Sequence, residues 1–428
     1  MPENLCTGIA VVIDNEVTTD PDIKAIISKI ENNGIPVYSF KSIKNARASL
    51  QSFRTINFLI LDWRMHTSSA DYESGLMPGY FSQLYEADST DAIDFIKKLR
   101  EICFVPVFIF TNEPEGTIND EIISKLRESQ LYFDDETRNF IHIRNKSSIL
   151  RETGVIEEIN AWISKIPSLY LLKIWENELF KAKNTIFWEL YYASNGSWPK
   201  MLWENFKKEN EDPKYGLNDT LFQLLKAHID LGALEEEKVL SKSVYDLEDV
   251  KKLLKGTMYC SNTLTIDKPG DIYKKGDTYY LNVRPECDTI PGRPECEYIY
   301  LIKGDALEMK KIPPEKKKEL YNTKIGFYEK IGECFIFLFE NEAEVINFKL
   351  NTLKVEKGGE WSAYKKCRLL PPYITHIQQK CSIYLSRVGK PRLPIQIEND
   401  FFPPATIPEI QSNISTNNTK QVPNESKS

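Results

Sequence analysis

Hydrophobic and polar positions form a repeating pattern over the first 166 residues. Short apolar runs rich in β-branched residues are separated by longer stretches in which apolar residues recur with a helical period. The apolar runs predict five strands, at Gly8–Ile13, Pro36–Phe40, Ile56–Leu61, Val105–Phe110 and Phe140–Ile143. Strands that alternate with helices are typical of a parallel sheet. The fold class predicted for residues 1–166 is therefore α/β, a doubly wound parallel sheet of five β–α units.

The stretches between the strands show apolar residues on one helical face. Ile23, Ile26, Ile27 and Ile30 share one such face, and a single last helix is expected from about Ser148 to Ile163. A further helix is expected to begin at about Thr90, which leaves an insertion of some 27 residues after the third strand. A loop there could cover the carboxyl end of the sheet or dock a partner kinase. A variable surface excursion explains the insertion equally well.

The pattern changes twice more along the chain. Residues 167–256 carry Leu, Trp and Phe at helical spacing and are predicted to be a helical middle region, with Trp175, Phe187, Trp188 and Trp203 as core residues. Residues 257–402 show short β-type runs broken by Pro and Gly, which predicts a β-rich domain with a helix near its end. Residues 403–428 are polar and are expected to be a disordered tail.

Composition narrows the choice of partners. The chain is 41% hydrophobic and 27% charged, as ordinary globular proteins are, and its formal charge of −7 argues against a nucleic-acid partner. No apolar run approaches the ~18–20 residues of a membrane span, so no membrane partner is expected. The first residues lack the pattern of a secretory signal, and the eight cysteines form no C-x-x-C pair. These features predict a cytoplasmic protein with reduced thiols.

Candidate chemistry lies where the predicted strands end. Asp14 follows the first strand, Asp62 follows the third, Thr111 follows the apolar run of the fourth, and Lys146 comes shortly after the fifth. In open α/β sheets, ligands bind outside the carboxyl ends of the strands. An acid, a second acid, a hydroxyl and an amine in this order resemble the receiver domain of response regulators in two-component systems.

The resemblance to the receiver family implies a role for each residue. Asp62 is expected to accept a phosphoryl group and become 4-aspartylphosphate. A carboxylate that attacks a phosphoryl group faces charge repulsion, which Mg²⁺ bound by Asp14, Asp62 and the backbone carbonyl of Arg64 would neutralise. Lys146 is expected to pair with a phosphoryl oxygen, and Thr111 to move toward another oxygen and so couple phosphorylation to a loop shift. The implied partner is a sensor histidine kinase.

Two positions depart from the receiver pattern. The family generally has a pair of acids after the first strand, and here the second position holds Asn15. Glu16 follows, but successive residues at a strand end point in different directions. The family also usually has a proline after the lysine, where this chain has Ser147. The first departure predicts weaker metal binding, and it favours the alternative of a pseudo-receiver that only docks proteins.

The remaining two thirds of the chain show no recognisable enzyme motif. The run from Lys268 to Asp288 is similar to a module found beside unusual receivers in bacterial defence operons. The whole arrangement resembles the non-effector receiver protein of the Detocs anti-phage system, which implies a phosphate sink or relay, with a second receiver-effector protein as a further partner. The chain is thus expected to be a signalling protein and no enzyme. The alternative is an effector whose activity uses Asp271, Cys287 and Asp288.

Overall fold

The computed structural model describes most of the chain. The described residues are 5–50, 56–65, 78–112, 116, 121–151, 154–240, 245–261, 266–307, 314, 332–338 and 344–387. Residues 66–77 of the predicted insertion and the whole of the predicted tail lie outside these ranges. Within them, no helix is both long enough and apolar enough to cross a lipid bilayer.

The N-terminal part is built on a parallel sheet of five strands in the order β2-β1-β3-β4-β5. This confirms the predicted α/β class. The strands are β1 (Ile9–Ile13), β2 (Val37–Phe40), β3 (Ile56–Leu61), β4 (Val107–Thr111) and β5 (Ile141–Asn145). Every residue of β3 and of β4 is buried, because helices cover both faces of the sheet. Buried strands of this kind read as continuous apolar runs, which is why they could be found from the sequence.

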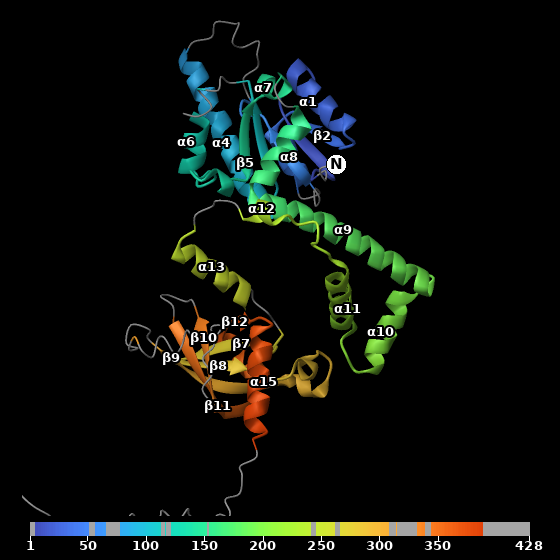
Figure 1. Cartoon of the computed structure of the whole chain (residues 1–428), viewed down its shortest axis with the longest axis vertical. Coiled ribbons are helices and arrows are strands. Elements are labelled where there is room, and N and C mark those ends of the chain that lie inside the picture. The colour runs from blue at the N-terminus through green and yellow to red at the C-terminus, as the bar shows by residue number, and fades with distance from the viewer. Residues whose placement is uncertain are drawn as a thin grey trace, which may run out of the picture.

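Helices pack on the two faces of this sheet (Figure 1). On one face, α1 and α8 contribute Ile23, Ile159 and their neighbours to a core with Val12 and Phe108. On the other face, α2 and α4 join Leu59 and Ile109 in a second core. The helices are α1 (Pro21–Asn32), α2 (Ile43–Leu50), α4 (Pro78–Ile102), α6 (Ile123–Glu128), α7 (Lys146–Arg151) and α8 (Val155–Lys165).

Two helix predictions in this part were wrong. The single helix expected from Ser148 to Ile163 is two helices, α7 and α8, separated at Gly154, whose φ of 87° is a left-handed conformation that suits glycine. The helix expected at about Thr90 begins at Pro78, so residues 78–89 of the predicted insertion are helical. Proline at the first helical position is favourable because the missing N–H would have no partner there.

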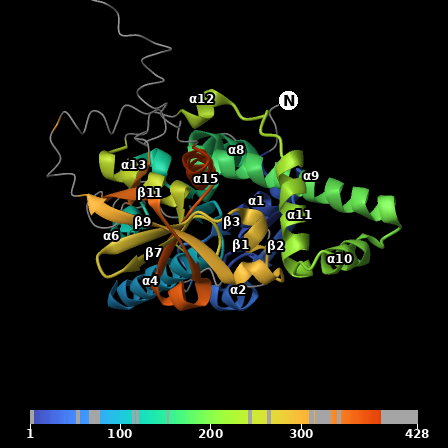
Figure 2. The same cartoon turned by 90° about the horizontal axis from the view of Figure 1, so that it is seen from below.

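The middle region is helical, as predicted. Its helices are α9 (Pro167–Ser194), α10 (Trp198–Lys208), α11 (Pro213–His228), α12 (Glu236–Val239) and α13 (Leu247–Met258). The first turns of α9 carry Leu169 and Ile174, which belong to the same core as α8. Beyond them α9 projects to one side and returns through α10 and α11 (Figure 2).

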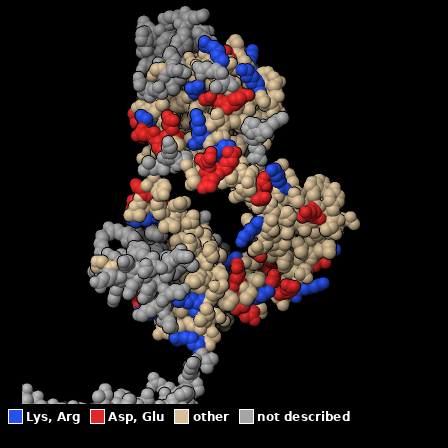
Figure 3. Space-filling view, in the orientation of Figure 1, with Lys and Arg blue, Asp and Glu red and all other residues tan. Residues whose placement is uncertain are grey.

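The prediction that the tryptophans and Phe187 of this region are core residues was wrong for three of the four positions. Trp175, Phe187 and Trp188 are 44%, 47% and 58% exposed, and Trp203 is half-buried. The cause is that α9 contacts other helices along only part of its surface. Figure 3 shows that much of the surface of α9, α10 and α11 on this side of the molecule carries neither acidic nor basic side chains.

The C-terminal part is an antiparallel sheet of seven strands in the order β10-β11-β9-β8-β7-β12-β6. The helix α15 (Tyr373–Leu385) packs through Ile374 and Ile377 against one face, and Trp361 lies in a small cluster with Tyr273 and Leu301. The strands are β6 (Tyr259–Cys260), β7 (Asp271–Lys275), β8 (Thr278–Asn282), β9 (Tyr298–Leu307), β10 (Glu333–Leu338), β11 (Glu344–Lys357) and β12 (Lys365–Leu369). This confirms that the C-terminal part is β-rich, as predicted.

Candidate functional site

The carboxyl ends of the parallel strands meet at one edge of the N-terminal sheet. Strands β1, β3, β4 and β5 are neighbours, so residues that follow them come close together although they lie far apart in the sequence. Helix α7 starts at this edge, and Figure 1 shows α9 and α12 at the opposite edge. The site therefore lies at the end of the N-terminal part that faces away from the middle and C-terminal regions.

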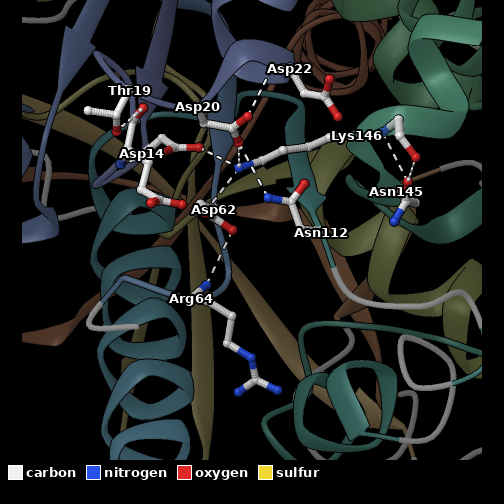
Figure 4. Close-up of polar contacts among 11 residues, drawn as sticks. Asp14, Thr19, Asp20, Asp22, Asp62, Arg64, Asn112, Asn145 and Lys146 are labelled. Atoms are coloured by element: carbon white, nitrogen blue, oxygen red, sulfur yellow. Dashed lines mark hydrogen bonds and ion pairs between the residues drawn. The ribbon is translucent and has the colours of Figure 1, made fainter. Parts of the chain in front are cut away.

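The Lys146 ammonium is the centre of the site (Figure 4). Its Nζ donates to Asp14 Oδ2 at 2.7 Å and to Asp62 Oδ2 at 3.2 Å, and all three side chains are buried. Asn145, the last residue of β5, accepts hydrogen bonds from the backbone amides of Ser147 and Ser148 and so caps α7. This cap fixes the point at which the Lys146 side chain leaves the sheet edge.

The Asp62 carboxyl lies in an environment that opposes its ionisation. Burial raises the pKa of Asp62 to about 7, and the nearby Asp14 charge adds to the rise, although the Lys146 ammonium and the Arg64 amide act in the other direction. The second carboxylate oxygens of Asp14 and Asp62 accept hydrogen bonds from backbone amides. Asp14 Oδ1 accepts from the amide of Glu16 at 2.7 Å, and Asp62 Oδ1 accepts from the amide of Arg64 at 3.3 Å.

A third carboxylate, which the sequence did not indicate, also faces Lys146. Asp20 Oδ2 lies 3.3 Å from Lys146 Nζ and accepts from the side-chain amide of Asn112, also at 3.3 Å. Desolvation works to raise the pKa of Asp20, but the amide of Asp22, Lys146 and Asn112 outweigh it, so the pKa is lowered. The signal that could have placed Asp20 is the Asp-Pro pair at 20–21, which marks a helix start beside the end of β1.

The structure places the other two predicted residues beside this cluster. Thr111 is the last residue of β4, is fully buried, and is paired across the sheet with Asn145, the residue before Lys146. The Arg64 backbone lies next to the Asp62 carboxylate, while its guanidinium is directed away and bonds Glu121 at 3.2 Å. Thus Asp14, Asp62 and Lys146 are in direct contact, and Thr111 and Arg64 flank them.

The donor set at this edge suits a hard divalent cation. Asp14, Asp20 and Asp62 offer carboxylate oxygens, which Mg²⁺ prefers as ligands. When all three are ionised, the Lys146 ammonium leaves a surplus of two negative charges in a largely buried position. Within the described ranges, no group of three Asp, Glu, His or Cys side chains is already arranged to hold a metal ion. The three carboxylates instead converge on the Lys146 ammonium. The residues fit Mg²⁺ by chemistry and by charge.

The candidate residues of the C-terminal domain do not form a comparable group. Asp271 is fully buried and accepts two hydrogen bonds from Arg368, at 2.6 and 3.1 Å, and one from the amide of Lys268. Cys287 is exposed, with its thiol donating to the adjacent Asp288, and the hydrogen bond raises the pKa of the thiol. A raised pKa disfavours the reactive thiolate. The contacts of Asp271 are those of a structural ion pair.

Comparison with known proteins adds little to this geometry. The sequence matches no protein-family model and no curated protein. Among solved structures, a fusion that carries the yeast Spc42 trimeric coiled coil covers 44% of this chain and 97% of its own length, with 15% identity and a TM-score of 0.24. A TM-score of that size carries no argument about the fold or the function.

Proposed function

We propose that this protein is a response regulator that accepts a phosphoryl group on Asp62 from a partner histidine kinase. The observation that carries the proposal is the buried contact of the Lys146 ammonium with both Asp14 and Asp62. These residues follow three different strands, and their types and order are those of a receiver domain. The proposal assigns residues 1–166 to that domain.

The topology of the sheet supports the same assignment. In the order β2-β1-β3-β4-β5, the chain winds to opposite sides from β1 and β3, so these neighbours form the topological switch point. Ligands of doubly wound sheets bind at such a point, outside the carboxyl ends of the strands. Asp14 and Asp62 follow these two strands.

The chemistry assigned to the site is a transfer between two nucleophiles. An Asp62 carboxylate oxygen forms a P–O bond as the P–N bond to the kinase histidine breaks, and the imidazole leaves with the electron pair. Lys146 then holds a phosphoryl oxygen, and the Thr111 hydroxyl donates to another. Mg²⁺, when bound, neutralises the charge that otherwise repels the incoming phosphoryl group. Asp14 and Asp62, with the Arg64 carbonyl, are the protein groups assigned to hold it.

We further propose a cellular role, which rests on the resemblance of the whole arrangement to the non-effector receiver protein of the Detocs system. The protein acts as a phosphate sink or relay in anti-phage defence in the cytoplasm, and it draws phosphoryl groups from a kinase that also serves a second receiver-effector protein. The contacts of Asp271 with Arg368 support this over the effector alternative, because they occupy both oxygens of the carboxylate that the alternative requires.

The test is phosphoryl transfer from a labelled partner kinase in the presence of Mg²⁺. The wild-type chain is expected to take up the label, and Asp62→Asn, which keeps the size of the side chain, is expected to take up none. Asp22→Asn is a matched control, since Asp22 lies outside the Lys146 cluster, and it should be labelled like wild type. Equal labelling of wild type and Asp62→Asn would contradict the proposal.

A second measurement separates a phosphoacceptor from a docking pseudo-receiver. Beryllofluoride with Mg²⁺ mimics an acyl phosphate, so it should raise the melting temperature of the wild-type chain and leave Asp62→Asn unchanged. An unchanged melting temperature of the wild type, together with absent labelling, would favour the pseudo-receiver that the Asn15 position suggests.

A further inference from the structure

The position directly after Asp14 lacks the acid that a cation site of this kind calls for. Asn15 stands there, and an amide carries no charge to balance a cation. Glu16 contributes its backbone amide, which donates to Asp14 Oδ1 at 2.7 Å. At the end of β1, Asp14 brings its carboxylate into contact with the Lys146 ammonium.

Asp20 brings a further carboxylate to the same place from the start of α1. Its Oδ1 accepts from the amide of Asp22 at 2.8 Å and caps the helix. Its Oδ2 faces Lys146 Nζ, and the side chain is only 10% exposed. One oxygen thus fixes the side chain while the other is presented to the cluster (Figure 4).

The position of Asp20 is rigid because α1 is anchored in the core. Ile23, Ile26 and Ile30 on one face of this helix are fully buried against the sheet. Asn112, which follows β4, donates to Asp20 Oδ2 and holds it from the other side. The positive end of the α1 dipole also stabilises a negative charge at this cap.

Charge balance gives Asp20 a function beyond capping. Without Asp20, the ionised Asp14 and Asp62 and the Lys146 ammonium leave one surplus negative charge. With Asp20 the surplus is two, which a divalent cation neutralises in full. Neutralisation matters at a largely buried site, because uncompensated charge is costly away from water.

We propose that Asp20 is a third acidic residue that holds the divalent cation at this site, beside Asp14 and Asp62, and that it takes the place of an acid at position 15. The assignment rests on the proposed phosphoacceptor function for the identity of the cation as Mg²⁺. In this assignment, the start of α1 supplies the carboxylate that position 15, at the end of β1, does not supply.

Calorimetric titration of the full unphosphorylated chain with MgCl₂ tests the assignment without any phosphoryl transfer. Asp20→Asn removes the charge and keeps a good helix cap, so α1 should remain intact. We expect this variant to bind Mg²⁺ at least roughly tenfold more weakly than wild type. Asp22→Asn removes the same charge from the same helical turn, and its affinity should stay within about twofold of wild type.

A rescue variant distinguishes a cation ligand from a merely structural residue. Adding Asn15→Asp to Asp20→Asn moves the acid back to the end of β1, and Mg²⁺ affinity should return toward the wild-type value. Wild-type affinity in Asp20→Asn, absent Mg²⁺ binding by the wild type, or a double variant as weak as the single one would each overturn the assignment. Phosphoryl transfer to Asp62 is measured in a separate experiment. If the wild-type chain is labelled at Asp62 but Asp20→Asn binds Mg²⁺ as tightly as wild type, only the assignment of Asp20 is wrong and the proposed function stands.

Discussion

The Lys146 ammonium lies 2.7 Å from Asp14 Oδ2, although the two residues are 132 positions apart in the chain. The residue after the fifth strand thereby closes a buried ion pair with the residue after the first. Because the strand order is β2-β1-β3-β4-β5, this contact spans β3 and β4 and can form only above the carboxyl edge of the sheet. The same ammonium reaches Asp62 and Asp20, so one cation organises the whole site.

Replacing the Lys146 side chain by an uncharged one should destabilise the N-terminal part. Lys146→Met leaves the carboxylates buried without their partner, and loss of one member of a buried ion pair costs about 3–5 kcal/mol. Urea unfolding in EDTA is expected to show this loss, and added Mg²⁺ to restore part of it. Lys125→Met is the control, because Lys125 pairs with Glu121 in a more exposed position and should lose less than ~1 kcal/mol. Equal losses in the two variants would show that the Lys146 cluster contributes no special stability.

The raised pKa of Asp62 predicts how stability depends on pH in the absence of divalent cations. Because the pKa is about 7 in the folded chain and 3.8 for an ordinary Asp, the folded state holds a proton between these values that the unfolded state has released. The stabilisation from this proton is present at low pH and is lost as the pH rises through about 7.

The matching measurement compares wild type with Asp62→Asn, which does not titrate. In EDTA, the variant should melt at a higher temperature than wild type at pH 8, by on the order of a few °C. The difference should shrink at pH 5, where wild-type Asp62 is protonated. A gain that is the same at both pH values would mean that Asp62 does not titrate with a raised pKa.

Thr111 is expected to act after phosphoryl transfer. Thr111→Val keeps the shape of the buried side chain but removes the hydroxyl, whereas Thr111→Ser retains it. Both variants should accept phosphoryl groups on Asp62. Beryllofluoride should change the hydrogen-exchange protection of β4 and the residues around Asn112 in wild type and Thr111→Ser, and much less in Thr111→Val. If beryllofluoride changes the protection of Thr111→Val as much as that of wild type, the Thr111 hydroxyl does not couple phosphorylation to the loop shift.

In the C-terminal domain, Asp271 is predicted to be structural. Asp271→Asn leaves the Arg368 guanidinium without its buried counter-ion and should destabilise the antiparallel sheet by about 3–5 kcal/mol. Labelling of Asp62 should be unaffected, because Asp62 follows a strand of the parallel sheet and Asp271 belongs to the antiparallel sheet. If Asp271→Asn folds with wild-type stability, the ion pair with Arg368 does not stabilise the antiparallel sheet. That result would favour a functional role for the Asp271 carboxylate.

The sequence could predict the N-terminal fold because its central strands are buried on both faces. In the run Ile56–Leu61 every residue except Asn57 is apolar, and the polar residue that follows the run marks the edge of the sheet. Asp14, Asp62 and Lys146 could be found in this way. For Asp20 the sequence offers only the Asp-Pro pair that marks a helix start, and the path of the preceding turn decides whether such a cap residue faces solvent or the cluster.

Other features depended on packing that local patterns do not record. Helical spacing of Phe187 and Trp188 predicts burial, but the spacing shows only that the residues lie on a helix. At this end of α9, the helices α10 and α11 cover only part of its surface. The separation of α7 from α8 depends on the positive φ of Gly154, and a glycine alone does not reveal whether it breaks a helix or lies within one.

The most direct test of the central claim is the chemical identity of the modified residue. The full chain is incubated with Mg²⁺ and acetyl phosphate or the phosphorylated kinase, and then treated with borohydride, which reduces an aspartyl phosphate to homoserine. Peptide mass spectrometry should find homoserine at position 62 and aspartate at positions 14 and 20. An unmodified Asp62 in a chain that has taken up phosphate, or homoserine at another position, would contradict the claim that Asp62 is the phosphoacceptor.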